Sequence, residues 1–152
     1  MNLGQSLRVM SRTTTHIDAT PDRVFDLLDD ARTYEFWVVG CKDIRAVDDD
    51  WPANGSAFHH KVGMGPISVA DSTSILERER PRHLKLRARA RPAGIAHVDF
   101  ALTPSGSGTT ITITEAPVEG LPAKLHNPVQ DKLIHGRNVE TLRRLKWLAE
   151  RG

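Results

Sequence analysis

A histidine and two carboxylates, His60, Asp71 and Glu115, fall on the apolar faces of predicted strands, where they could work as an acid–base set. Histidine titrates near neutral pH, and a carboxylate that holds its ring suits it to proton transfer. In this interpretation His60 is the general base, Asp71 tunes it, and Glu115 is the acid or an orienting group. Such a set would suit an aldol-type cyclisation or a dehydration. The same side chains could instead be polar anchors in a mostly apolar binding pocket.

Glu115 closes the stretch TTITITEA at residues 109–116, where a buried side chain is expected next. Ile111 and Ile113 alternate with threonines, and this two-residue period is typical of a strand with one apolar face. Glu115 follows in phase with the isoleucines, although a carboxylate in a packed core is costly unless it is paired or neutralised. The pattern predicts either that the strand ends before Glu115 or that this face borders a hollow. Glu115 could also form a structural ion pair with Arg137.

His60 and Asp71 owe their predicted orientation to the same alternation. His60 is in phase with Phe58 in AFHHKV, and Asp71 is in phase with Ile75 in ISVADSTSIL. If the segment GMGP closes a simple hairpin, His60 lies diagonally from Asp71 and within reach of a hydrogen bond. Each residue also has a structural interpretation. His60 could be a core histidine with satisfied hydrogen bonds, and Asp71 could bind strand-end amides or an arginine.

Small residues on the inward faces of two further strands also favour a hollow. Ala88 and Ala90 point inward in HLKLRARAR, and Ala96 does so in GIAHVDFAL. A tightly packed core would place larger side chains at these positions. The outward residues of the first of these strands form a basic stripe: Lys85, Arg87, Arg89 and Arg91. The stripe could contact an acidic partner, or it could discourage pairing at a sheet edge.

The composition fits one soluble globular domain over residues 1–152, with residues 1–8 as a loose N-terminal extension. The chain has 152 residues, of which 39% are hydrophobic and 26% charged. Its net charge of +2 is too small to argue for nucleic-acid binding. Cys41 is the single cysteine, so no intrachain disulfide can form, and a cytoplasmic location is expected. No stretch has the length and hydrophobicity of a signal peptide or a bilayer span, so stable membrane insertion is not expected.

The order of predicted elements is one strand, two short helices, six strands and one long helix. The first strand covers residues 10–17, and Thr20 with Pro21 opens a helix that ends near Asp30. A second helix over residues 33–38 closes at Gly40. The remaining strands, separated by short turns that favour an antiparallel meander, cover residues 44–47, 57–62, 67–76, 84–90, 95–102 and 109–115.

The C-terminal segment carries the strongest helix signal, with Asn127 as its cap, Pro128 at its start and Gly152 just past its end. A helix of roughly twenty residues is about 30 Å long and can cover a sheet. One face of the predicted helix carries the residues Ile134, Asn138, Thr141, Leu142, Leu145 and Ala149. A single helix cannot fill a concave sheet wider than itself. The sequence therefore predicts an α+β fold with a curved antiparallel sheet of about seven strands and a cavity beneath the helix.

The sequence also resembles a known family in the segments TPDRVFDLLDDARTYEFWVVG at residues 20–40 and HGRNVETLRRLKWLAE at residues 135–150. Together with the order of elements, they resemble the START/Bet v 1-like, or SRPBCC, superfamily of polyketide cyclases, dehydrases and lipid-transport proteins. The likeness is to small single-domain bacterial members and covers nearly the whole chain. The resemblance implies a helix-grip fold with a cavity for lipids, polyketides or other apolar molecules. It supplies no catalytic residue set, because some members are enzymes and others only carry ligands or bind proteins.

Nine residues are predicted to bind the ligand. The apolar wall would come from Phe58, Phe100, Ile113 and Leu142, with Trp37 in the region that the resemblance places at the cavity mouth. The ligand's polar end would be oriented by His60, Asp71, Glu115 and Asn138. Trp37 could equally be hydrophobic filler, and Asn138 could cap a strand end.

Three functions remain open at this point. The first is non-catalytic binding of a small hydrophobic ligand, and the second is a polyketide aromatase/cyclase or dehydratase that uses His60, Asp71 and Glu115. The third is an adaptor that works through the basic stripe or the surface around Trp147. No cofactor or metal is expected, because the sequence has no HExxH, CxxC or HxH spacing. The expected partner is a small ligand and not a nucleic acid, and the protein is expected to be a monomer or a homodimer.

Overall fold

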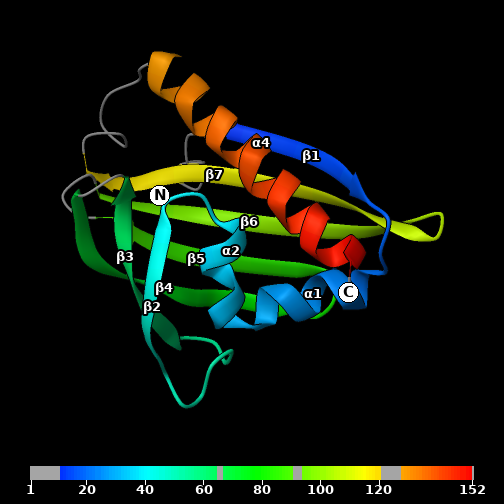
Figure 1. Cartoon of the computed structure of the whole chain (residues 1–152), viewed down its shortest axis with the longest axis horizontal. Coiled ribbons are helices and arrows are strands. Elements are labelled where there is room, and N and C mark those ends of the chain that lie inside the picture. Colours follow the sequence, from blue (N-terminus) through cyan, green and yellow to red (C-terminus); the bar gives the residue numbers. More distant parts are fainter. Residues whose placement is uncertain (1–10, 65–66, 91–93, 121–127, 152) are drawn as a thin grey trace, which may run out of the picture.

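The computed structural model describes residues 11–64, 67–90, 94–120 and 128–151. Within these ranges the strands form one antiparallel, seven-stranded sheet in the order β1-β7-β6-β5-β4-β3-β2 (Figure 1). The strands are β1 (Ser11–Ile17), β2 (Cys41–Val47), β3 (Ala57–Met64), β4 (Ile67–Glu79), β5 (His83–Ala90), β6 (Gly94–Ser105) and β7 (Gly108–Gly120). Strands β2 to β7 follow one another as a meander, and the last strand, β7, pairs with the first strand, β1.

The helices are α1 (Pro21–Asp29), a 3-10 turn η1 (Ala31–Thr33), α2 (Tyr34–Trp37) and the long C-terminal α4 (Pro128–Arg151). The hydroxyl of Thr20 caps α1 by accepting a hydrogen bond from the amide of Arg23. Asp30 ends α1 and then caps η1 by accepting from the amide of Arg32. The local caps therefore explain why the chain turns sharply between the two short helices.

The predicted order of elements is confirmed, but several boundaries differ. The second predicted helix, over residues 33–38, is divided between η1 and α2. Strand β2 begins at Cys41 and not at residue 44, because Cys41 and Lys42 already pair with β3. Strands β4, β6 and β7 are each several residues longer than predicted, since their ends pair beyond the last apolar residue of the pattern. The predicted cap Asn127, the start of the first strand and the N-terminal extension lie outside the described residues.

Helix α4 lies on the same side of the sheet as α1 and α2 and runs along β1 (Figure 1). The predicted inward face of α4 is confirmed, since Asn138, Thr141, Leu142, Leu145 and Ala149 are all buried. Two parts of the space beneath α4 differ. Under residues 142–149 the space belongs to the cluster of buried apolar residues, which also contains Ile17, Phe25, Leu28 and Ile111. We call this part the filled half, and the part under residues 130–141 the hollow half.

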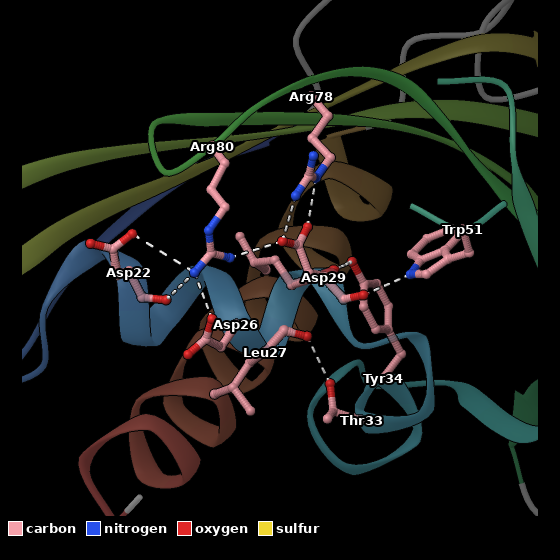
Figure 2. Close-up of polar contacts among 10 residues, drawn as sticks. Asp22, Asp26, Leu27, Asp29, Thr33, Tyr34, Trp51, Arg78 and Arg80 are labelled. Atoms are coloured by element: carbon pink, nitrogen blue, oxygen red, sulfur yellow. Dashed lines mark hydrogen bonds and ion pairs between the residues drawn. The ribbon is translucent and has the colours of Figure 1, made fainter. Parts of the chain in front are cut away.

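A polar cluster fixes α1 to the end of β4 beside the filled half (Figure 2). Both oxygens of the Asp29 carboxylate accept from Arg78, at 2.8 and 2.7 Å, and Oδ2 also accepts from Arg80 at 2.8 Å. Arg80 reaches Asp26 as well, at 2.6 Å. The backbone carbonyl of Asp29 accepts from Trp51 Nε1 at 2.7 Å, which ties in the loop between β2 and β3.

Strand β2 is the last strand of the sheet and is irregular. Its pairing with β3 shifts between Lys42 and Ala46, and Asp43 has a φ of 46°, in the left-handed region that aspartate tolerates better than most residues. The side chains of Asp43 and Arg45 are exposed within this shift. The outer edge of the sheet is therefore both kinked and charged.

Candidate functional site

The hollow half contains a cavity of about 240 Å³ between the sheet and α4. Strands β3 to β7, the segment after α2 and the first half of α4 contribute to its wall. The lining residues are Tyr34, Val38, Val39, Gly40, Cys41, Phe58, His60, Val62, Thr73, Leu86, Ala88, Arg89, Gly94, Ile95, Ala96, Val98, Phe100, Ile113, Glu115, Pro117, Glu119, Gln130, Ile134, Arg137, Asn138 and Thr141. Most of these side chains are apolar, and the polar ones converge from two sides.

The floor of the cavity is a row of residues that pair across the sheet. Thr73 on β4 pairs with Ala88 on β5, Ala88 pairs with Ala96 on β6, and Ala96 pairs with Pro117 on β7. The two central positions carry only a methyl group. Larger side chains would fill the space up to α4, so these alanines account for part of the hollow.

His60 and Thr73 form a hydrogen-bonded pair on the side of the cavity formed by β3 and β4. His60 is 4% exposed, and its Nε2 lies 2.9 Å from Thr73 Oγ1. Its Nδ1 lies 3.3 Å from the carbonyl oxygen of Lys61. Burial lowers the pKa of His60 from its usual 6.5, against a smaller opposite effect of the Lys61 hydrogen bond and the Asp71 charge. His60 is therefore a neutral imidazole at pH 7.

Asp71 does not hold His60, as the sequence had suggested. The two residues are directly opposite in the β3–β4 register and not diagonal. The Asp71 side chain is buried and pairs with Arg89, whose Nε lies 2.5 Å from Oδ1, and Oδ1 also accepts from the amide of Ser72. This corresponds to the structural interpretation of Asp71. The predicted His60–Asp71 hydrogen bond is wrong because a buried carboxylate is better stabilised by a guanidinium than by a neutral imidazole.

Arg89 also corrects the predicted basic stripe on β5. It lies among the cavity-lining residues and pairs with Asp71, so it does not belong to an outward cationic row. Arg87 does not line the cavity but lies 3.8 Å from Glu119, which does, and Arg91 lies outside the described residues. The stripe is therefore interrupted and partly neutralised.

A second polar group lies on the opposite side of the cavity, where β7 meets α4. Glu115 is 5% exposed, and its Oε1 forms a short ion pair with Arg137. Asn138 Nδ2 donates to the same oxygen at 3.3 Å. Strand β7 continues past Glu115 to Gly120, so Glu115 is buried within the strand and is stabilised by partners from the helix. The ion pair with Arg137 explains how a carboxylate can be buried on the apolar face of β7.

Six of the nine predicted site residues line the cavity: Phe58, His60, Phe100, Ile113, Glu115 and Asn138. Whether they bind a ligand remains a prediction. They come from β3, β6, β7 and α4, elements that the antiparallel order brings to one face of the sheet.

The other three predicted residues, Trp37, Asp71 and Leu142, do not line the cavity. Trp37 is fully buried, with its ring against Phe100 at a centroid distance of 5.9 Å and its Nε1 bonded to Thr33. Asp71 is covered as it pairs with Arg89, and Leu142 points into the filled half. Trp37 thus supports the cavity wall from behind, through Phe100.

Several lining residues were missed because their signal was weak. Val38 and Val39 lie between α2 and β2, and Cys41 is the first residue of β2, ahead of the predicted strand start, so strand alternation gave no orientation for them. Burial raises the pKa of the Cys41 thiol to about 12, so it acts as an apolar group. Thr141 lies on the buried helix face, and its hydroxyl accepts from the amide of Val39 at 3.1 Å. That bond joins α4 to the segment that closes the cavity.

Within the described ranges, no three His, Cys, Asp or Glu side chains come together as a metal site would require. No helix in these ranges combines the length and hydrophobicity needed to cross a membrane.

Comparisons with known proteins agree with the fold. The structure is similar to protein CV1439 from Chromobacterium violaceum, with a TM-score of 0.70 and 20% identity over 91% of this chain and 95% of that one. It is also similar to a START superfamily protein from Mycobacterium smegmatis, with a TM-score of 0.73 and 18% identity over 95% of this chain and 99% of that one. Ara h 8.0201 gives a TM-score of 0.75 at 8% identity, over 97% and 100% of the two chains.

These likenesses establish the fold, which is the helix-grip fold of START and Bet v 1-like proteins. No curated protein sequence matches the chain significantly. The family model described as polyketide cyclase/dehydrase and lipid transport matches residues 8–150. The chain therefore belongs to the polyketide cyclase/dehydrase and lipid transport family, within the SRPBCC superfamily.

Proposed function

We propose that this protein binds a small, largely apolar molecule, such as a lipid or a polyketide, in the cavity of the hollow half. The observation that carries the proposal is the cavity itself, about 240 Å³ with a mostly apolar wall and two separate polar groups. This combination is typical of small-molecule sites, although the volume lies just below the usual range of about 300–1,000 Å³. The occupant is therefore small, of the size of a two-ring molecule or a medium-length chain.

The cyclase or dehydratase hypothesis has less support from the contacts of His60. Asp71 pairs with Arg89, so no carboxylate orients the imidazole, and the Nε2 lone pair faces the hydroxyl of Thr73. A general base needs that lone pair free for the substrate proton. Replacing His60 with glutamine tests the enzyme hypothesis, because an enzyme that uses His60 as its general base loses turnover, and unchanged turnover would contradict that role.

Native mass spectrometry of the purified protein, followed by a thermal-shift panel of apolar compounds, tests the proposal. The panel contains fatty alcohols, fatty acids, fused-ring phenols and substituted biphenyls. We expect a co-purifying small molecule or a saturable shift with at least one class. A protein that is always empty and responds to no class would overturn the proposal.

A matched pair of variants locates the binding site. Ala96→Leu adds three carbons to the cavity floor, whereas Ala101→Leu adds them to an exposed position of the same strand. We expect Ala96→Leu to weaken binding by more than tenfold and Ala101→Leu to leave it unchanged. Equal effects of the two variants would place the ligand elsewhere.

A further inference from the structure

We propose that the cavity selects an uncharged ligand that carries a hydroxyl group at each of two ends and that it rejects carboxylates. This inference rests on the proposed function, since it names the class of molecule that the same cavity binds. It is carried by the hydrogen-bonding positions that the buried polar groups leave open on the two sides of the cavity.

On one side, the pairing of His60 leaves Thr73 as an acceptor. The Lys61 carbonyl can only accept, so Nδ1 of His60 carries the hydrogen and donates to it. The other ring nitrogen, Nε2, is then an acceptor, and the Thr73 hydroxyl donates to it at 2.9 Å. A hydroxyl has one hydrogen and two lone pairs. Because Thr73 has used its hydrogen and lines the cavity, it can bind a ligand only by accepting from a donor.

On the opposite side, Glu115 also offers an acceptor. Arg137 and Asn138 both donate to Oε1 of its carboxylate. Among the described residues no donor reaches Oε2. Since Glu115 lines the cavity, Oε2 is available to a ligand hydroxyl. A hydrogen bond from a hydroxyl to a carboxylate is charge-assisted and stronger than one between neutral groups.

The two acceptors are separated by the apolar floor. Thr73 is on β4 and Glu115 on β7, three strand spacings apart, or about 14 Å across the sheet. Thr73 is in register with Ala88 and, through it, with Ala96, whereas Glu115 pairs with Val98 on β6, so the wall between the two acceptors is apolar. A ligand with a flat apolar middle and one hydroxyl at each end matches this arrangement.

The charges of the wall argue against an acidic ligand. Arg89 is already paired with Asp71, and Arg137 with Glu115, while His60 is neutral. A carboxylate in the cavity would therefore bring a negative charge close to Glu115. Arg89 and Arg137 would not be free to pair with it, because each is already paired with a carboxylate of the protein. The ligand carboxylate would also face Thr73, which accepts and does not donate. A buried, poorly compensated charge is costly, so an alcohol or phenol is preferred to the corresponding acid.

Four biphenyls that share one apolar core test the inference by calorimetry at neutral pH: 4,4′-dihydroxybiphenyl, 4,4′-difluorobiphenyl, biphenyl-4,4′-dicarboxylate and biphenyl itself. Fluorine is close in size to a hydroxyl group but has no hydrogen to donate. We expect the diphenol to bind about tenfold or more tightly than the difluoro compound, from two additional hydrogen bonds. The dicarboxylate should bind at least tenfold more weakly than the diphenol. Equal affinities of the diphenol and the difluoro compound, or tighter binding of the dicarboxylate, would overturn the inference.

Two substitutions assign the preference to its acceptors. Thr73→Val removes the hydroxyl at constant shape and should reduce the preference for the diphenol over the difluoro compound to a few-fold. Glu115→Gln removes the negative charge and should raise the affinity for the dicarboxylate. If Glu115→Gln fails to fold, as circular dichroism would show, Thr73→Val alone still decides. An unchanged preference in Thr73→Val would overturn the assignment.

The outcomes keep this inference apart from the proposed function. If biphenyl and its difluoro derivative bind as well as the diphenol, the cavity binds apolar molecules, and only the hydroxyl preference is wrong. If no biphenyl binds but a fatty acid from the wider panel does, the function stands and the inference is again wrong. If nothing in the wider panel binds, the proposed function itself fails.

Discussion

The two halves of the space beneath α4 are covered by the same helix but built in opposite ways. In the filled half, Leu142, Leu145 and Ala149 meet large apolar residues of α1, β1 and β7, and little of any side chain is exposed. In the hollow half, the helix presents Ile134, Asn138 and Thr141 to a cavity whose floor is made of alanines. The difference shows that one helix can anchor a fold with its second half and form the roof of a site with its first.

The largest expected effect is on stability when the filled half loses a side chain. Leu145→Ala should lower the free energy of unfolding by about 2–5 kcal/mol, because Leu145 is fully buried and its removal leaves a void. Ile134→Ala is the matched change in the hollow half. It should cost markedly less, because Ile134 is only partly buried and already faces empty space. Urea unfolding of both variants measures the difference, and equal costs would contradict the distinction between the halves.

The polar cluster beside the filled half should give the next largest effect. Asp29→Asn removes the charge that holds Arg78 and Arg80, and we expect a loss of about 1.5–3 kcal/mol in unfolding free energy. Asp26→Asn is the control, since Asp26 is 58% exposed and contacts Arg80 alone among these arginines. It should cost less than about 1 kcal/mol. A similar cost for both variants would mean that the cluster does not fix α1 to β4.

Adding a larger side chain to the packed core and to the cavity tests the same difference in packing. Ala31→Leu places a larger side chain in the packed core and should cost about 1–3 kcal/mol. Ala88→Leu places the same side chain in the cavity and should leave the stability unchanged or raise it by about 0.5–2 kcal/mol. Thermal unfolding of the two variants provides the comparison. If Ala88→Leu destabilises the protein as much as Ala31→Leu, the cavity has no room for a ligand.

The smallest expected effect is a change in the pH dependence of stability. Burial lowers the pKa of His60 below 6.5 in the folded protein. As the pH falls, His60 is therefore protonated in the unfolded chain before it is protonated in the folded protein, and this favours unfolding. The contribution of His60 is therefore fully present above pH 6.5 and is lost as the pH falls from there toward the lowered pKa. His60→Gln should flatten this part of the urea-unfolding profile without changing its course above pH 7. An unchanged acid limb would show that His60 is not the group responsible. Burial also lowers the pKa of His97, so His97→Gln measures how much of the same acid limb belongs to that residue.

The sequence predicted the fold well because each element carried its own local signal. Alternation identified the strands, the Thr20 cap and Pro21 identified α1, and the spacing of apolar residues identified the buried face of α4. Boundaries were less well predicted, since pairing continues into Glu77–Glu79 in β4 and into Ala116–Gly120 in β7, and neither segment shows the alternation. A backbone that is already hydrogen-bonded on both sides needs no apolar pattern to stay extended.

The site was predicted in outline but not in its partners. Phase placed His60 and Glu115 correctly on the inner face, because alternation depends on the backbone alone. The choice of partner depends on distances that the sequence does not contain. Asp71 has two possible partners: His60, directly opposite on β3, and Arg89 on β5, the strand on its other side. Asp71 pairs with Arg89 because a buried carboxylate needs a charged donor. The long arginine side chain can reach Asp71 although strand alternation predicts that it points to the other face of the sheet.

The irregular outer strand β2 has a consequence for the molecule in solution. A straight edge strand offers a row of free amides and carbonyls that another chain can match. In β2 the register shift and the left-handed Asp43 interrupt that row, and the charges of Asp43 and Arg45 stand within the gap. The strand is a poor template, so the edge-to-edge addition that begins fibril growth is disfavoured at this end of the sheet.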